Sequence, residues 1–303
     1  MHTGQNYDGY ALTNMGYDYL VLKVFMKRKL VKQVGLKIGV GKESDIYVCT
    51  TYDEERPTVI IKFARLGRTC FRTVKDNRDY LRKGAGCHSW LYMSRLASLK
   101  EYAFMKVLYE KGFPTPVPID SNRHGICMSL IEAYPMTQVS AFINPRDVYQ
   151  KLIDLIIKLA EHGLVHGDFN EFNLMIDDEE KVTMIDFPQM LSTSHPNARY
   201  YFERDVGCVQ TYFTKHYGLQ FEGMPILDTD IDKKVDLDLE VKASGFAKEQ
   251  FGEKDLDAVF DSVTQAQLGD LQTEEDQEDD EESEDEQEEA DENPSQNQNE
   301  EIK

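Results

Sequence analysis

The sequence predicts an α+β protein whose N-terminal part contains antiparallel strands and one long helix, and whose C-terminal part is mostly helical. Short strand patterns broken by glycine or polar turns occupy residues 34–63 and 126–132, while helical periodicity marks residues 94–111 and 147–162. Short apolar segments ending in polar residues fill 164–186. A chain of 303 residues is long enough for one or two domains with a full core.

Charge and cysteine content restrict the classes of protein. The net charge of -21 is concentrated at the end, because seventeen acidic residues and one lysine follow residue 271, which leaves about -5 for the rest. The acidic run at 274–292 is predicted to be disordered. Five scattered cysteines without a paired motif argue against disulfides or zinc and favour a reducing compartment. No signal peptide or membrane-spanning run is recognisable, so we expect an intracellular protein without membrane contact.

The first 34 residues predict a short strand at Tyr10–Thr13 and a helix from about Asn14 to Lys29 with a basic last turn. A strand and one helix cannot bury a core. We therefore expect this piece either to be an N-terminal extension that packs on the main domain or to be the remainder of a larger module.

A glycine-containing turn lies between two predicted strands at residues 39–45. Gly39 and Gly41 would expose backbone N–H groups, and Lys42 and Ser44 would add an ammonium and a hydroxyl, all suited to phosphates. The order strand, glycine turn, strand differs from a Walker loop, which leads into a helix. An ordinary hairpin that uses glycine for positive φ is the alternative.

Lys62 is the one charged residue in the predicted strand at 59–63. After a glycine-rich hairpin, such a lysine is a candidate for holding the α- and β-phosphates of a nucleotide. Glu101, in the helix at 94–111, is its candidate carboxylate partner. An edge lysine and a solvated helix carboxylate are the alternatives.

Residues 65–95 form a basic stretch with a net charge of +6 and interleaved aromatic residues. Such a segment beside a nucleotide cleft suggests contact with a nucleic-acid backbone or an acidic partner. A solvated loop anchored by its aromatics is the alternative.

A connector follows the strand that begins at Ile126. In a two-lobed kinase this is the hinge, where backbone groups of Met128, Ser129, Leu130 and Ile131 would meet adenine. The helix at 147–162, ended by Gly163, leads into the next strand.

Asp168, Asn173 and Asp186 each lie at the end of a predicted short strand, and an acidic turn at 177–180 joins the last two strands. Asp168 could accept or orient a hydroxyl proton, while Asn173 and Asp186 could supply hard oxygen ligands to magnesium. Because Asp and Asn are also common turn residues, turn capping is the alternative.

These residues occur in protein-kinase order with suitable spacing, which predicts a two-lobed protein-kinase-like fold: Gly39, Gly41, Lys62, Glu101, Asp168, Asn173 and Asp186. Three departures stand out. Gly167 replaces the usual Arg of the catalytic loop, Pro188 replaces the Gly of Asp-Phe-Gly, and an Ala-Pro-Glu segment is missing. These departures resemble the RIO family of atypical serine/threonine kinases.

Five motifs resemble the second, winged-helix-bearing RIO subfamily: Gly-Val-Gly-Lys-Glu-Ser-Asp-Ile-Tyr at 39–47, Leu-Gly-Arg-Thr at 66–69, Ser-Trp-Leu-Tyr at 89–92, Ile-Asp-Phe-Pro-Gln at 185–189 and Ser-Thr-Ser-His-Pro-Asn-Ala at 192–198. The resemblance covers about residues 9–250. It predicts four parts: a partial winged helix at 1–34, a kinase domain at 35–225, a C-terminal extension at 226–260, and a disordered acidic tail at 261–303. Within the kinase domain it predicts an N-lobe at 35–128, a hinge at 129–134 and a C-lobe at 135–225.

The resemblance implies a Mg-ATP-dependent kinase or ATPase that acts as an assembly factor in late maturation of the small ribosomal subunit. It implies an ion pair between Lys62 and Glu101, phosphate contacts from Lys42 and Ser44, catalysis by Asp168, and Mg²⁺ bound by Asn173 and Asp186. Asp186 is also implied as a phosphate acceptor that forms an aspartyl-phosphate. Asp205 is expected to hold the catalytic loop.

The implied partner is a pre-ribosomal small-subunit particle, with RNA contacted through residues 65–95. The implied location is the cytoplasm, with shuttling through the nucleus left open, and the oligomeric state is not predicted. Two other functions remain as alternatives: a small-molecule phosphotransferase of the aminoglycoside- or choline-kinase type, and a non-catalytic ATP-sensing scaffold that binds RNA.

Overall fold

The computed structural model describes residues 2–3, 8–9, 12–41, 43–66 and 90–243. The chain divides into two compact units. In the unit formed by Met1–Leu12, Gly86–Ser89 and Glu253–Lys303, the described elements are the paired strands β1 (His2–Thr3) and β2 (Asp8–Gly9).

The other unit comprises Thr13–Ala85 and Trp90–Gly252 and contains two parts. The elements of its N-terminal part are α1 (Asn14–Lys27), β3 (Gln33–Val40), β4 (Ser44–Thr50), β5 (Thr58–Ala64), α3 (Trp90–Glu110), β6 (Pro118–Asn122) and β7 (Gly125–Ser129). The C-terminal part follows with β8 (Tyr134–Pro135), η1 (Met136–Gln138), α4 (Pro145–Glu161), β9 (Leu164–Val165), β10 (Leu174–Ile176), β11 (Val182–Met184), β12 (Leu191–Ser192), α5 (Ala198–Tyr217) and α6 (Leu237–Ala243).

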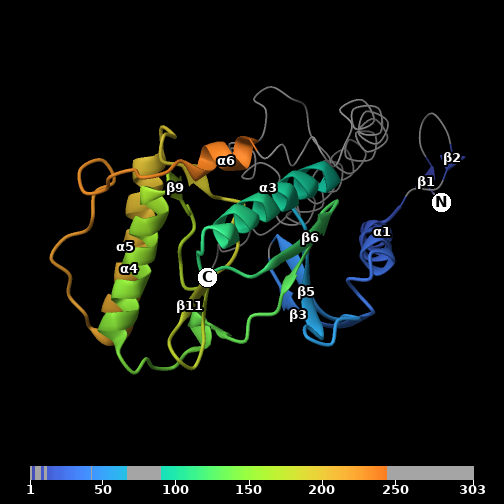
Figure 1. Cartoon of the computed structure of the whole chain (residues 1–303), viewed down its shortest axis with the longest axis horizontal. Coiled ribbons are helices and arrows are strands. Elements are labelled where there is room, and N and C mark those ends of the chain that lie inside the picture. Colours follow the sequence, from blue (N-terminus) through green and yellow to red (C-terminus); the bar gives the residue numbers. More distant parts are fainter. Residues whose placement is uncertain (1, 4–7, 10–11, 42, 67–89, 244–303) are drawn as a thin grey trace, which may run out of the picture. The chain divides into compact units, whose positions relative to one another are not determined.

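A five-stranded antiparallel sheet of order β3-β4-β5-β7-β6 forms the N-terminal part (Figure 1). Successive side chains of a strand point to opposite faces. On β5, Ile61 and Phe63 therefore pack in a core with α1, while Ile60 and Lys62 face α3. This alternation places Lys62 on the face of the sheet where Glu101 lies.

Helix α1 packs on the outer face of this sheet and shares a core with it through Val21 and Phe25. Thr13 caps the helix, its hydroxyl accepting a hydrogen bond from the Gly16 N–H at 3.2 Å. The strand predicted at Tyr10–Thr13 is therefore wrong at its described end. The boundary predicted at residue 34 falls inside β3. Because α1 and the sheet share a core, they form one packed body. The winged-helix assignment stays a prediction.

The C-terminal part is built on α4 and α5, which lie side by side (Figure 1) and bury an aromatic and aliphatic core. Asn144 caps α4, and the predicted acidic turn joins β10 to β11, with the Asp177 carboxylate accepting the N–H groups of Glu179 and Lys181. Residues after α5 return to α4, where Leu237 N–H donates to His162 O at 3.0 Å.

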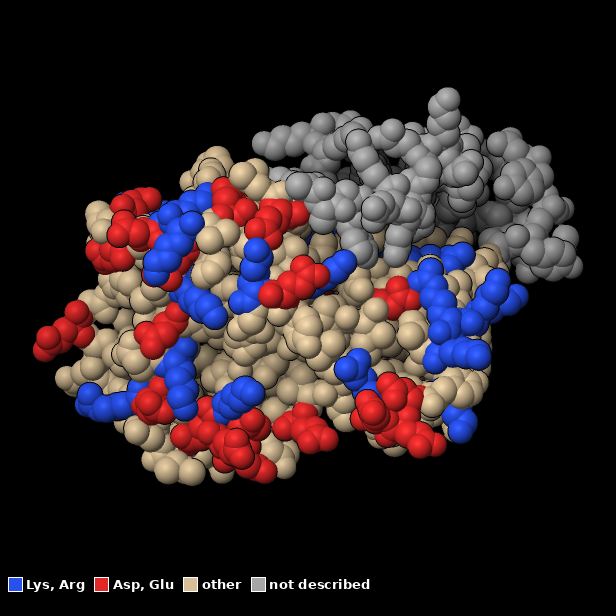
Figure 2. Space-filling view, in the orientation of Figure 1, with Lys and Arg blue, Asp and Glu red and all other residues tan. Residues whose placement is uncertain are grey.

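The predicted boundary at residue 225 therefore lies within a packed region that continues to α6. The acidic tail predicted at 261–303 lies outside the described residues. In the described ranges, no helix is both long and apolar enough to cross a membrane. Figure 2 shows acidic and basic side chains interspersed over one face, with Lys and Arg gathered over α1.

Candidate active site

The loop from His166 to Asn173 joins β9 to β10 and carries Asp168. Its backbone is fixed by α5: the Asp205 carboxylate accepts the N–H groups of Gly167 and Phe169 at 2.8 and 2.9 Å. Arg204 donates to the Gly167 carbonyl. Burial raises the pKa of Asp205 to about 7, against the two N–H donors, which lower it. The role expected for Asp205, holding the catalytic loop, agrees with this geometry.

The Asp168 carboxylate is surrounded by side-chain amides. Asn173 Nδ2 donates to Asp168 Oδ2 at 3.0 Å and to the Asp168 carbonyl at 2.9 Å, and Asn170 Nδ2 donates to Oδ1 at 2.9 Å. Because Asn173 uses its NH₂ group toward Asp168, its amide oxygen is the atom left to face a metal ion.

Asp186 lies beside Asn173 because the Ile185 N–H donates to the Asn173 carbonyl at 3.0 Å, one step beyond the paired ends of β10 and β11. Its backbone has a φ of 69°, in the left-handed region. The buried Lys62 ammonium contacts both Glu101 Oε1 at 2.6 Å and Asp186 Oδ1 at 2.7 Å. Burial acts to lower the pKa of Lys62, but the two carboxylates outweigh it and raise the pKa above its ordinary value.

The residues present fit Mg²⁺. Asn173 and Asp186 offer an amide and a carboxylate oxygen, and the Asp186 side chain is 41% exposed. Mg²⁺ usually takes only one or two protein oxygens and completes its octahedron with water and phosphates. Within the described ranges, no three His, Cys, Asp or Glu side chains gather into a metal site. An ion shared with phosphate oxygens therefore suits this chain better than a protein cage.

The glycine-containing hairpin joins β3 to β4. The Gly41 N–H donates to the Ser44 carbonyl at 2.8 Å, and a Cβ on Gly41 would lie 3.3 Å from the Ser44 hydroxyl oxygen. Gly39 packs against Ile46, where a Cβ would meet the side chain at 3.3 Å. Lys42 lies outside the described residues.

The hinge predicted at Met128, Ser129, Leu130 and Ile131 is only partly free of the sheet. Met128 is buried on β7, and the Ser129 N–H donates to the Val117 carbonyl at 3.0 Å. Leu130 and Ile131 are thus the two of the four that lie beyond the strand. Their contact with adenine stays a prediction.

Most of the basic stretch at 65–95 lies outside the described residues. Its first residue, Arg65, is buried and engaged: it contacts Asp18 of α1 at 2.5 Å and Asp45 of β4 at 3.0 Å. His124 joins the same network through Asp18 at 2.8 Å. Arg65 therefore ties α1 to the glycine-containing hairpin.

Sequence reasoning gave no role to three residues that border Asp168, namely Asn170, Gln189 and Arg204. Gln189 Nε2 donates to Asp168 Oδ2 at 3.1 Å, and the Arg204 guanidinium lies 3.9 Å from Oδ1. The motif Ile-Asp-Phe-Pro-Gln contains a proline that favours a turn after Asp-Phe, but it does not indicate where that turn places Gln189. Arg204 precedes Asp205 on the helix that holds the loop, which marks it as a neighbour.

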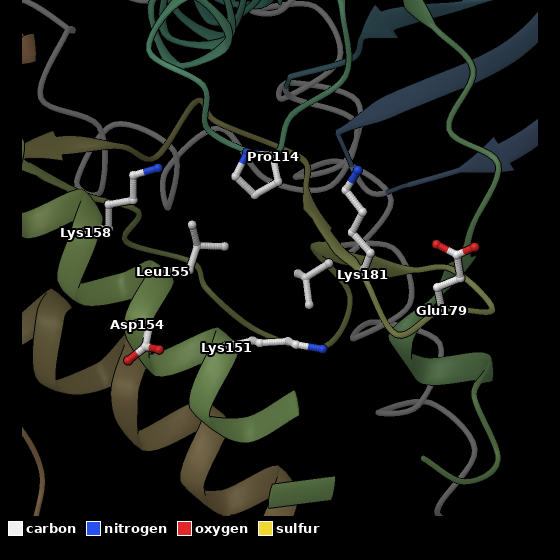
Figure 3. Close-up of a pocket in the computed structure, with 8 residues that line it drawn as sticks. Pro114, Lys151, Asp154, Leu155, Lys158, Glu179 and Lys181 are labelled. Atoms are coloured by element: carbon white, nitrogen blue, oxygen red, sulfur yellow. The ribbon is translucent and has the colours of Figure 1, made fainter. Parts of the chain in front are cut away.

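A separate cavity of about 440 Å³ lies between α4 and the β10–β11 hairpin. Figure 3 shows the side chains of three lysines around Leu155 at its rim: Lys151, Lys158 and Lys181. The predicted phosphate, metal and hinge residues do not line this cavity. The cluster around Lys62 and Asp186 stays the predicted site of nucleotide handling.

Comparison with known proteins relates this geometry to a family. The model of the RIO domain matches residues 45–224, which is more than half of the chain. The serine/threonine-protein kinase rio2 of Dictyostelium discoideum is 53% identical over 250 residues, covering 82% of this chain and 47% of that protein. Its Schizosaccharomyces pombe counterpart is 50% identical over 248 residues, covering 81% and 71% respectively. The chain thus spans about half the length of the Dictyostelium relative.

A crystal structure of the Rio2 kinase from Chaetomium thermophilum, a complex with ADP/Mg²⁺ and phosphoaspartate, matches with a TM-score of 0.69 and 44% identity. The match covers 88% of this chain and 80% of that one. It confirms the predicted two-lobed protein-kinase-like fold, and the family inferred from the five motifs is confirmed as well. The chain belongs to the RIO-domain family.

Proposed function

We propose that this chain is a Mg-ATP-dependent atypical serine/threonine protein kinase with ATPase activity. The observation that carries the proposal is the Lys62 ammonium held between Glu101 and Asp186, with Asn173 beside Asp186 and bonded to Asp168. Serine/threonine kinase relatives and a similar ADP- and Mg²⁺-bound structure support it. A RIO-domain match over 45–224 favours this function over a small-molecule phosphotransferase.

Each residue then has a defined task. Lys62 binds phosphate oxygens, and Glu101 keeps its ammonium in place within the buried face of the sheet. Asn173 and Asp186 would hold Mg²⁺, which when bound neutralises charge on the phosphates. Asp168 orients the attacking hydroxyl or water and accepts its proton. The hairpin at Gly41 and Ser44 covers the phosphates.

We further propose that Asp186 accepts the γ-phosphoryl group. One Asp186 oxygen attacks the γ-phosphorus, the bond to the bridging oxygen breaks, and ADP leaves with the electron pair. Water then attacks the phosphorus, its proton passes to Asp168, and the Asp186 carboxylate is released. The phosphoaspartate of the Chaetomium structure supports this step.

The test is ADP production at saturating ATP with and without Mg²⁺. Asp168→Ala is expected to abolish turnover while leaving ATP binding within a fewfold of wild type, because Asp168 acts on the attacking hydroxyl or water and not on the nucleotide. Retained turnover in this variant contradicts the proposal.

For the partner, we propose a pre-ribosomal small-subunit particle, bound through RNA in the cytoplasm. Besides the family resemblance, four exposed lysines in and just after α1 support it: Lys23, Lys27, Lys29 and Lys32. Replacing Lys27 and Lys29 by Gln should weaken RNA binding and flatten its salt dependence, by a slope of about 0.7 for each lost phosphate contact. Lys215→Gln on α5 is the matched control, and an unchanged salt slope in the double variant contradicts the assignment.

A further inference from the structure

The segment after Asp186 is a fixed turn. The Phe187 carbonyl accepts the Met190 N–H at 3.2 Å, with Pro188 at the second position, where its restricted φ suits a turn. Strand β12 then pairs antiparallel with β9, placing Leu191 opposite Val165. Residues 187–192 are therefore held against the strand that leads into the catalytic loop.

Gly167 allows this turn to close on the loop. Its φ is 79°, and a Cβ on Gly167 would lie 2.8 Å from the Gln189 carbonyl oxygen, closer than real Cβ contacts. The backbone of Gln189 thus packs directly against Gly167. From that position the Gln189 side chain reaches Asp168, where Nε2 donates to Oδ2 at 3.1 Å.

We propose that Gln189 is a positioning residue that holds the Asp168 carboxylate toward the attacking nucleophile. This inference rests on the proposed function. The terminal torsion of an aspartate is broad, so the orientation of the carboxylate depends on its donors. Asn170 and Asn173 belong to the catalytic loop itself, whereas Gln189 adds a second donor on Oδ2 from a separate segment. With Asn170 on Oδ1 and both Asn173 and Gln189 on Oδ2, the carboxylate plane is fixed from two sides.

Two departures from the usual kinase pattern then have one physical purpose. Glycine at 167 permits the close approach, and proline at 188 sets the turn that presents Gln189. In the hydrolytic step, water attacks the phosphorus on Asp186, and its proton moves to Asp168. The phosphorus–oxygen bond to Asp186 breaks with its electron pair returning to that carboxylate. Gln189 takes part in no covalent change in this step, but its hydrogen bond orients the Asp168 carboxylate that receives the proton.

The experiment compares Gln189→Leu and Gln189→Glu with wild type in steady-state ATP turnover between pH 5 and 8. Leucine keeps the size and removes the donor, so kcat should fall about tenfold to a hundredfold while KM for ATP stays within about twofold. Glutamate repels ionised Asp168 near pH 8 but donates a hydrogen bond when protonated. The activity of Gln189→Glu relative to wild type should therefore recover as the pH falls, and that of Gln189→Leu should not.

Gln150→Leu is the matched control, because Gln150 lies exposed on α4 and donates to Asp154 at 2.8 Å, outside the site. Wild-type kcat in Gln189→Leu overturns the inference, as do parallel pH profiles of the two Gln189 variants. If Gln189→Leu does not fold, shown by its unfolding transition, the pH profile of Gln189→Glu decides. A wild-type chain without ATP turnover overturns the proposed function as well, whereas wild-type turnover with unaffected variants overturns this inference alone.

Discussion

Gly167→Ala tests the packing that closes the catalytic loop. The new Cβ would lie 2.8 Å from the Gln189 carbonyl oxygen and 3.0 Å from Leu191 Cδ2. The leucine methyl can move, but the carbonyl belongs to a turn held by β12 and cannot shift without opening it. Alanine also pays for the left-handed backbone at φ 79°.

Both the backbone conformation and the close contact reduce the free energy of unfolding. A left-handed backbone costs a non-glycine residue about 1–2 kcal/mol. Overpacking a closed contact adds about 1–3 kcal/mol. Since alanine also restricts the unfolded chain, which returns about 0.4–1 kcal/mol, we expect a net loss of about 1–5 kcal/mol in the free energy of unfolding.

Gly112→Ala is the matched control, because Gly112 has a φ of 73° and nothing within 4 Å of a built Cβ. It should show the backbone cost alone. Urea unfolding of both variants measures the difference, provided that the m-values agree. If Gly167→Ala is no more destabilising than Gly112→Ala, the close contact with the Gln189 carbonyl is not a constraint, and the reasoning fails.

Three further changes test the rest of the site. Asp205→Ala leaves two buried backbone N–H groups without their acceptor and should lower the free energy of unfolding in urea by about 2–4 kcal/mol. Asp205→Asn keeps one acceptor oxygen and should lower it by less. Equal losses in the two variants would contradict the account. Burial lowers the pKa of His166 to about 4, so between about pH 6.5 and pH 4 this histidine is protonated in the unfolded chain but neutral in the folded chain. The free energy of unfolding should therefore decrease as the pH falls and be about 3 kcal/mol lower at pH 4 than at neutral pH. His166→Asn should remove that part of the pH dependence, and identical pH curves would refute it. Lys62→Ala removes the ammonium that contacts the buried Glu101 carboxylate and should cost about 3–5 kcal/mol. The double variant Lys62→Ala with Glu101→Ala should restore most of that loss.

The sequence was sufficient for most of the site because its signals are local. The place of Lys62 in a strand after the glycine-containing hairpin identified it as a candidate partner of Glu101, which it contacts, and the short strand patterns placed Asn173 and Asp186 just beyond paired strand ends. Helices at 94–111 and 147–162 were predicted to within a few residues, since caps and glycine stops mark their ends.

What the sequence did not predict depends on contacts between distant segments. Packing of the N-terminal piece on the main domain was one of two expectations, but its polar network of Asp18, Arg65 and His124 was not predicted, because no local pattern connects these three residues. The contact of Gln189 with Asp168 likewise requires Gly167 and a turn to meet across twenty residues. Tertiary contacts of this kind have no periodic signature.

The central claim is that Asp186 carries the phosphoryl group during turnover. The most direct measurement is a single-turnover incubation with γ-labelled ATP and Mg²⁺, followed by hydroxylamine treatment of the trapped protein. The account predicts label that hydroxylamine releases and that Asp186→Asn lacks. Label that resists hydroxylamine and resides on serine, or hydroxylamine-labile label that persists in Asp186→Asn, would contradict it.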